Sequence, residues 1–318
     1  MIITVTMNAA VDHTVAVPSV RLGHRHRAVE SRTTAGGKGV NVARALRSLG
    51  RPVIATGLVG GRAGQRIVDM LAEEDVLNDF VRAEGESRTN IVLVDPTSGE
   101  RTELNERGPE VAGAEVERFI DRLLYLARGA ELCVIAGSIP PGVAADTYTR
   151  LIEELQRLDV PCILDTDGEA MRAGLKAGPA VVAPNAAEAE ETVGHEFNDP
   201  GDYQLGLESL VEMGARQAIV TREAGCVAIV DDGAPHRYEV SIDPLEPVAT
   251  VGSGDAFLAG YVAARHEGSS VADCLAFGVA CGAESTQHFG AGTIDPEEVG
   301  RILPHVEVQE LDVPTAVS

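Results

Sequence analysis

The segment ELCVIAGSIPPGVAADTYTRLIEELQRLDVPCILD, residues 131–165, decides the fold class of this chain. Its two ends, ELCVIAG (131–137) and VPCILD (160–165), are continuous apolar runs, which are typical of parallel strands buried on both faces. The stretch between them at 145–159 is amphipathic and is expected to be a helix. A strand, a helix and a second strand in this order predict a parallel sheet that helices cover on both sides.

The same alternation extends in both directions from this segment. Apolar strands are expected at 1–8, 54–60, 180–185, 217–221 and 226–230, and amphipathic helices at 39–50, 114–129 and 206–214. These elements predict an α/β fold of three layers, helix, sheet and helix, in which the central sheet is mostly parallel.

Four further segments alternate polar with apolar residues, as half-exposed antiparallel strands do. They are HTVAVPSV (13–20), HRAVESRTT (26–34), RTNIVLVD (88–95) and GERTELNER (99–107). We expect them to form a small antiparallel sheet that projects from the main domain and can lie over a cleft. The chain is then a single domain, residues 1–318, with lid strands inserted at about 12–34 and 88–107.

The composition argues against several classes of protein. The chain carries 26 basic and 49 acidic side chains, a net charge of −23, which repels nucleic acid and anionic membranes. No apolar run approaches the roughly 18 residues that a membrane helix needs. The start, MIITVTMN, reads as a strand without the basic flank of a signal peptide, so we expect a cytoplasmic protein. The five cysteines form no C-x-x-C pair and are expected to be buried hydrophobic residues.

Lysine occurs only twice, at positions 38 and 176, in a chain that otherwise uses arginine. A codon bias towards arginine and adaptation to high salt both explain the acidic, lysine-poor composition, and the sequence does not separate them. Lys38 lies inside the glycine cluster Gly36–Gly39, which indicates a slim point charge where a guanidinium would not fit.

The strongest local motif is ATVGSGDAFLAG, residues 249–260. Gly252, Ser253 and Gly254 come at the start of an amphipathic helix, where N–H groups can form a nest for an anion. Asp255 follows, and there it could take a proton from a hydroxyl while the nest holds the developing phosphate charge. The alternative is an ordinary helix cap with glycines for packing. Neither a P-loop nor a G-x-G-x-x-G fingerprint occurs, which weighs against a dinucleotide dehydrogenase.

A second motif, TAGGKGVNVARALRSLG (34–50), opens a helix with a glycine cluster. Its glycine N–H groups, the Lys38 ammonium and the Asn41 carboxamide could together hold sugar hydroxyls or a phosphate. A tight strand-to-helix turn without a ligand is the structural alternative for the same residues.

Other candidates follow apolar strands, where ligands bind in open α/β sheets. In PNAAEAEE (184–191), Asn185 and Glu188 share a helix face and suit contacts to phosphate and, through water, to Mg²⁺. The N-x-x-E pattern is also common in purely structural contexts. Asp12 follows the first strand and could grip sugar hydroxyls, and Ser138 follows a later strand.

Taken in order, these motifs resemble the PfkB-type carbohydrate kinases of the ribokinase superfamily over about residues 1–300. The glycine–lysine signature, the N-x-x-E block and the G-S-G-D-A-F signature follow one another as in that family. TVTMNAAVDHTV, AGGKGVNVARAL, TELNERGPEV and LDTDGEAM are most similar to its 1-phosphofructokinase and tagatose-6-phosphate kinase branch. The resemblance implies a ribokinase-like fold with a β lid, and transfer of phosphate from ATP to a hexose phosphate with Mg²⁺ as cofactor.

The resemblance also implies a role for each candidate residue. Asp255 matches the catalytic base, and Gly252, Ser253 and Gly254 match the anion hole. The residues that match the sugar-phosphate site are Asp12, Arg25, Gly37, Lys38, Asn41, Arg88 and Ser138. Those assigned to the nucleotide site are Asn185, Glu188, Thr221, Gly225, Thr250, Gly252, Gly254, Cys281 and Ser285, with Glu188 reaching Mg²⁺ through water. In many members the lid also forms the dimer contact, so a homodimer is an expectation for this chain.

Several positions depart from the family pattern. Ala9 replaces the usual proline of the first motif, Ala183 replaces a frequent lysine, and the nucleotide loop gains Glu223. Where 6-phosphofructokinases of the family carry a second phosphate-binding arginine, this chain has Glu103, which would repel a phosphate; Arg107 is a candidate to compensate. We therefore expect fructose 1-phosphate as the substrate. The alternatives are tagatose 6-phosphate, an unphosphorylated sugar or nucleoside, and a non-enzymatic role as a sugar-phosphate sensor.

Overall fold

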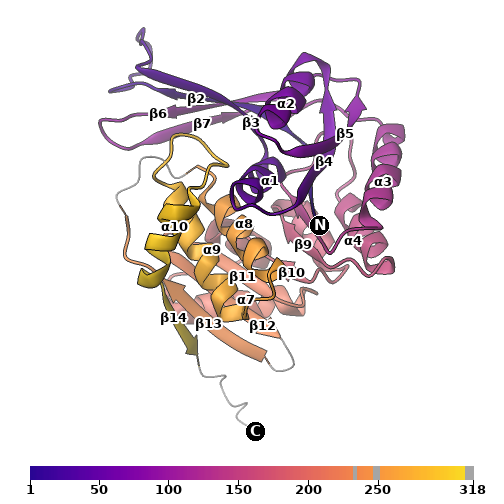
Figure 1. Ribbon diagram of the computed structural model, residues 1–318, viewed down its shortest axis with the longest axis vertical. Coiled ribbons are helices and arrows are strands. Elements are labelled where there is room, and N and C mark those ends of the chain that lie inside the picture. The colour runs from indigo at the N-terminus through magenta and orange to yellow at the C-terminus, as the bar shows by residue number, and fades with distance from the viewer. Residues whose placement is uncertain (232–234, 246–250, 312–318) are drawn as a thin grey trace.

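A computed structural model describes residues 1–231, 235–245 and 251–311, and these residues form two sheets (Figure 1). The strands of the larger sheet are β1 Ile2–Thr6, β4 Val53–Gly60, β5 Leu77–Ala83, β8 Leu132–Ala136, β9 Cys162–Asp165, β10 Val181–Val182, β11 Ala218–Arg222, β12 Gly225–Asp231, β13 Pro235–Ser241 and β14 Glu307–Leu311. Their order is β14-β13-β12-β11-β10-β9-β8-β1-β4-β5. Neighbours from β11 to β5 are parallel, whereas β12, β13 and β14 extend one edge as antiparallel strands.

Helices cover both faces of this sheet. Against one face pack α1 Lys38–Ser48, α2 Gly61–Glu73, α8 Ser253–His266, α9 Val271–Ser285 and α10 Pro296–Ile302, followed by the short 3₁₀ helix η1 Leu303–His305. Against the other pack α3 Gly113–Ala127, α4 Thr147–Arg157, α5 Gly168–Leu175, α6 Ala186–Val193 and α7 Pro200–Glu212. The three-layer α/β class predicted from the sequence is therefore confirmed.

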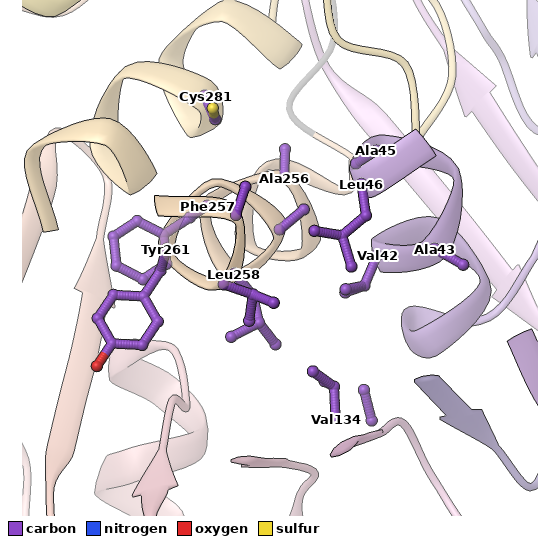
Figure 2. Packing of buried hydrophobic residues seen from close by; sticks show 14 of the residues in the cluster. Val42, Ala43, Ala45, Leu46, Val134, Ala256, Phe257, Leu258, Tyr261 and Cys281 are labelled. Carbon is purple, nitrogen blue, oxygen red and sulfur yellow. The ribbon is translucent and has the colours of Figure 1, made fainter. Parts of the chain in front are cut away.

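The central strands are buried on both faces because their side chains alternate between the two helical layers. In β8, Cys133 belongs to one core cluster and Val134 to the other. Figure 2 shows the second of these clusters, with Val42 and Leu46 of α1 and Leu258 of α8 on the same side of the sheet as Val134. This double burial explains why the strands β8 and β9 have no polar face.

The smaller sheet projects beside the larger one (Figure 1) and forms the lid. It contains β2 Ala10–Ala16, β3 Glu30–Gly36, β6 Arg88–Val94 and β7 Arg101–Asn105, in the order β3-β2-β6-β7. The outer pairs β2–β3 and β6–β7 are antiparallel, as predicted, but the central pair β2–β6 is parallel. The two halves of the lid come from distant parts of the chain, each as its own hairpin.

Two further expectations concern the chain as a whole. All five cysteines are free and buried, as the sequence predicted. Among the residues that the structure describes, no helix is both long enough and apolar enough to cross a membrane.

Candidate active site

A cavity of about 790 Å³ lies where the parallel strands end and the lid begins. Segments from both halves of the chain meet there, including the β11–β12 turn, the start of α8 and the lid strand β7. The predicted site residues that line it are Lys38, Asn185, Glu188, Thr221, Gly225, Gly252, Ser253, Gly254 and Asp255. The cavity thus occupies the edge of the sheet where open α/β folds bind ligands.

Asp255 is a buried carboxylate at the start of α8. The residue is only 7% exposed although it lines the cavity. Its Oδ2 accepts a hydrogen bond of 2.8 Å from Nδ2 of Asn41. Burial raises the pKa of Asp255 to about 7, and the nearby Lys38 ammonium opposes part of that rise. A carboxylate with a pKa in this range can accept a proton near neutral pH.

The two glycines before Asp255 differ in the space that the structure leaves for a Cβ. Gly252 has φ +81°, and a Cβ there would lie only 2.5 Å from Cβ of Ala291. Gly254 faces open space, because a Cβ there would have no neighbour within 4 Å. Together with Ser253 they begin the helix, where the first N–H groups have no partner within the helix. The start of α8 is thus a nest of amides open to the cavity.

Lys38 bridges two carboxylates at the cavity wall. Gly37, with φ +102°, precedes α1 and places the Lys38 Nζ 2.8 Å from Oδ1 of Asp165 and 2.7 Å from Oε1 of Glu188. Burial alone would lower the pKa of Lys38, but the carboxylates of Asp165, Glu188 and Asp255 outweigh it and raise the pKa. Burial raises the pKa of Asp165 to about 6, against the opposing charge of Lys38.

Asn185 and Glu188 form a capping box at the start of α6. Oδ1 of Asn185 accepts the backbone N–H of Glu188 at 3.0 Å, and Oε2 of Glu188 accepts the N–H of Asn185 at 3.0 Å. The structural alternative for the N-x-x-E motif is therefore realised. The same bonds fix both side chains at the cavity, where the other oxygen of Glu188 holds Lys38.

The side chains at the cavity limit how the predicted Mg²⁺ could be held. Across residues 1–231, 235–245 and 251–311, no group of three or more His, Cys, Asp or Glu side chains could hold a metal ion. Asp165 and Glu188 are both paired with Lys38. These residues fit a divalent ion that takes most of its ligands from outside the protein and reaches Glu188 through water.

Other predicted residues gather at the base of the lid. Asp12 in β2 accepts a hydrogen bond of 2.9 Å from Nδ2 of Asn90, and burial raises its pKa. A Cβ on Gly36 would lie 2.0 Å from Oδ2 of Asp12, so the neighbouring strand needs glycine there. Nδ2 of Asn8 donates to Oγ of Ser138 at 3.3 Å. Asp12 and Ser138 are thus held by amide side chains rather than left loose.

Arg88 lines a second cavity, of about 710 Å³, beside the lid base. Its Nε donates to the carbonyl of Asn8 at 3.0 Å, and its Nη1 donates to the carbonyl of Glu106 at 3.1 Å. Arg107 lines the same cavity. The acidic residues around the two arginines are Glu84, Glu86, Glu106 and Glu110. Two guanidinium groups therefore share one cavity at the base of the lid.

Thr250 lies outside the described residues. Seven other predicted residues are not among those that line either cavity: Asp12, Arg25, Gly37, Asn41, Ser138, Cys281 and Ser285. Arg25 is exposed in the loop between β2 and β3. Cys281 lies on α9 and packs against α8 (Figure 2). The contact is close, since a Cβ on Gly260 of α8 would lie 2.7 Å from its Sγ. Ser285 is buried and donates to the carbonyl of Gly282. The residues of α9 that line the main cavity are instead Val279, Gly282, Ala283 and Thr286.

Asp165 is a cavity residue that the sequence motifs did not identify. It ends the buried strand β9, and carboxylates at the carboxyl ends of parallel strands are placed to meet ligands. That signal is present in LDTDGEAM, residues 164–171, and could have identified it. Arg101 of β7 also lines the cavity from the lid and carries no comparable signal in the sequence.

Comparisons with known proteins agree with this geometry. A family model described as pfkB family carbohydrate kinase matches residues 5–298. The chain is 29% identical over 311 residues to 1-phosphofructokinase of Borreliella burgdorferi, covering 98% of this chain and 99% of that protein. A possible 1-phosphofructokinase from Thermotoga maritima has a TM-score of 0.89 at 26% identity, covering 98% and 100%. Ribokinase from Arabidopsis thaliana shares the fold, with a TM-score of 0.74 at 22% identity over 95% and 98%.

The family match spans most of the chain, and the relatives are matched over nearly their whole length. The ribokinase-like fold and the sugar-kinase class predicted from the sequence are therefore confirmed. The chain belongs to the pfkB family of carbohydrate kinases.

Proposed function

We propose that this sugar kinase phosphorylates fructose 1-phosphate with ATP, giving fructose 1,6-bisphosphate and ADP. The relative from Borreliella burgdorferi, which bears the name 1-phosphofructokinase, supports this substrate. The observation that carries the reaction type is the position of Asp255. It is a buried carboxylate beside the amides that begin α8, in a cavity that it shares with Lys38.

The proposed transfer is a direct displacement. The acceptor hydroxyl gives its proton to Asp255 while its oxygen bonds to the γ-phosphorus of ATP, and the bond from that phosphorus to the β-phosphate oxygen breaks. The amides of Gly252, Ser253 and Gly254 face the charge that develops on the transferred group. The hydrogen bond from Asn41 fixes the orientation of the Asp255 carboxylate.

The nucleotide would lie along the main cavity. Thr221 and Gly225 line the part formed by the β11–β12 turn, and the α9 residues Val279 and Ala283 offer an apolar wall for the base. Mg²⁺ bound with the nucleotide would neutralise phosphate charge. Glu188 would hold that ion through water, beside Asn185 in the same capping box.

The sugar phosphate would lie under the lid. Asp12, Gly37 and Ser138 are the candidates for its hydroxyls, and Arg88, Lys38 and Arg107 for its phosphate. Glu103 of β7 lines the main cavity, and a carboxylate there disfavours a phosphate at that end of the sugar, which argues against fructose 6-phosphate. Tagatose 6-phosphate and unphosphorylated sugars or nucleosides remain the alternatives. We take residues 1–318 as one catalytic domain, and we propose a homodimer formed through the lid.

A substrate panel tests the proposal. Fructose 1-phosphate, tagatose 6-phosphate, fructose 6-phosphate, fructose and ribose are each offered with Mg²⁺·ATP, and ADP release is followed together with the phosphorylated product. We expect the highest kcat/KM with fructose 1-phosphate. A higher kcat/KM with another sugar would replace the proposed substrate, and sugar-phosphate binding without ADP release would favour a sensor.

A further inference from the structure

Arg44 is a buried arginine that no step above uses. It lies on α1, one turn after Asn41, and is only 3% exposed. Its Nε and Nη2 donate to both carboxylate oxygens of Glu74, at 2.5 and 2.8 Å. Its Nη1 donates at 2.7 Å to the carbonyl of Ala291, and a longer bond of 3.5 Å reaches the carbonyl of Ala35. One guanidinium therefore joins α1 to three other segments.

The segment that Arg44 holds lies directly behind the anion nest. A Cβ on Gly252 would lie 2.5 Å from Cβ and 3.1 Å from Cα of Ala291, so these two residues are in close contact. Gly292 follows with φ +77°, and a Cβ there would lie 2.6 Å from Nη1 of Arg44. The backbone of residues 291–292 is thus packed between Arg44 and Gly252.

The lid holds the same segment from its other end. Nη1 of Arg32, in β3, donates to the carbonyl of Phe289 at 2.9 Å. Residues 289–292, which we call the backing segment, are therefore held by one arginine of the lid and one of the core. A movement of this segment would change the support of Gly252, because the two are in van der Waals contact.

We propose that Arg44 is a positioning residue for the anion hole, which it supports by holding the backing segment against Gly252. The inference deepens the proposed function and rests on it, because it takes the amides of residues 252–254 as the groups that stabilise the transferred phosphate. Arg44 itself lies behind Gly252 and is not among the residues that line the main cavity.

The role predicts a particular kinetic signature. Amides at the start of α8 act on charge that grows as the phosphoryl group moves, so their displacement lowers kcat more than it weakens ground-state binding. A purely structural arginine would instead lower thermal stability and leave the kcat of the folded enzyme unchanged. Lysine keeps the charge at position 44 but cannot reproduce the fork of donors that Arg44 directs at Glu74 and Ala291.

The test compares Arg44→Met and Arg44→Lys with Arg47→Met. Arg47 lies on the same helix, is exposed, and donates to the carbonyl of Asp75, so it is a matched control. With the best sugar substrate of the wild type, we expect Arg44→Met to lose about tenfold or more in kcat while both KM values change less than about threefold. Arg44→Lys should fall between Arg44→Met and the wild type, and Arg47→Met should keep the wild-type kcat.

A second measurement separates ground state from transition state. Binding of ADP alone should be unchanged in Arg44→Lys, whereas binding of ADP with aluminium fluoride and the sugar phosphate, a mimic of the transferred group, should weaken. A wild-type kcat in Arg44→Lys, or in a folded Arg44→Met, would overturn the inference whatever the thermal midpoint. If Arg44→Met fails to fold, Arg44→Lys alone decides. Absence of phosphoryl transfer in the wild-type protein would instead refute the proposed function.

Discussion

The proposed reaction depends on the carboxylate of Asp255. We expect Asp255→Asn to lower kcat about a thousandfold or more, because the amide cannot accept the hydroxyl proton. The Asn side chain can still accept the hydrogen bond from Asn41, so nucleotide affinity should change little. Steady-state kinetics and nucleotide titration check both statements. Turnover close to that of the wild type would exclude Asp255 as the base.

The raised pKa of Asp255 predicts how both kcat/KM and thermal stability depend on pH. Since burial raises that pKa from 3.8 to about 7, kcat/KM should rise with pH through an acid limb near 7. Because this pKa is higher in the folded protein than its ordinary value of 3.8, protonation of Asp255 favours the folded state. The resulting contribution to the free energy of unfolding is fully present below pH 3.8 and is lost as the pH rises through about 7. Asp255→Asn should therefore raise the thermal midpoint more at pH 8 than at pH 4, as calorimetry can measure. An equal effect at both pH values would contradict the burial argument.

A substitution at Lys38 tests its electrostatic coupling to Asp255. Its ammonium lowers the pKa of Asp255, so Lys38→Met should raise that pKa further and move the acid limb of kcat/KM to higher pH. The change also leaves Asp165 and Glu188 without their shared cation, so kcat should fall. Lys176→Met is the matched control, because Lys176 is exposed at the end of α5 and is the other lysine of the chain. An acid limb at the wild-type pH would refute the coupling.

The sequence identified residues of this site only where a local motif carried them. Asp255 and its glycines form one continuous motif, and the structure places them in the main cavity. Asp165 ends a buried strand, which is a local signal, but its contact with Lys38 joins segments 127 positions apart and could not be predicted from either segment alone. Cys281 was assigned to the nucleotide site from the family resemblance, but it faces α8. Helix α9 is apolar on most sides, so its pattern did not distinguish the cavity face from the core face.

At the start of α8, close packing against Ala291 requires glycine at position 252, whereas Gly254 borders open space in the cavity. Gly254→Ala places a methyl group in open space within the cavity wall, and alanine favours a helix more than glycine does. We expect the thermal midpoint to stay the same or rise while kcat/KM falls about tenfold or more, because the methyl group occupies space beside the amides. Enzyme kinetics and a thermal melt on the same preparation measure the two effects.

Gly300→Ala is the control for this prediction. Gly300 lies in α10, and a Cβ there also has no neighbour within 4 Å, but it is not among the residues that line either cavity. It should gain helix stability without any loss of kcat/KM. If Gly254→Ala behaved in the same way, the cavity beside the start of α8 would not be where the phosphate reacts.

The lid shows which features of a sheet can be predicted from the order of polar and apolar residues. Alternation of polar and apolar residues in the sequence located all four strands. In the structure burial alternates along β6, whereas β3 is exposed in its first half and buried in its second, and β7 is exposed throughout. It did not reveal that β2 and β6 run parallel, since the pairing of distant hairpins depends on where the core strands carry them. The continuous apolar strands of the central sheet were easier to predict, because such strands joined by helices allow few other arrangements. The strands β5, β13 and β14 were not predicted, because they are partly exposed and form no continuous apolar run.

At the scale of the whole molecule, two features bear on the proposed dimer. In the lid, the side chains of His13, Ile91 and Leu104 lie side by side on three adjacent strands. Glu103 lines the cavity, so Leu104, its neighbour in β7, points to the outer face, where it is 54% exposed. The charge of −23 on each chain opposes association, and salt screens that repulsion.

We expect Leu104→Glu to convert a dimer into a monomer, because the new charge would be buried in an interface formed by the outer lid face. Leu205→Glu on α7 is the matched control, since Leu205 is similarly exposed but lies away from the lid. Sedimentation velocity at low and high NaCl measures both variants and the wild type, whose dimer should tighten as salt rises. A wild-type monomer at every salt concentration, or dissociation by Leu205→Glu alone, would place any assembly elsewhere. Since Arg32 ties the lid to the backing segment, the kcat of Leu104→Glu would further show whether the lid needs a second chain to stay in place.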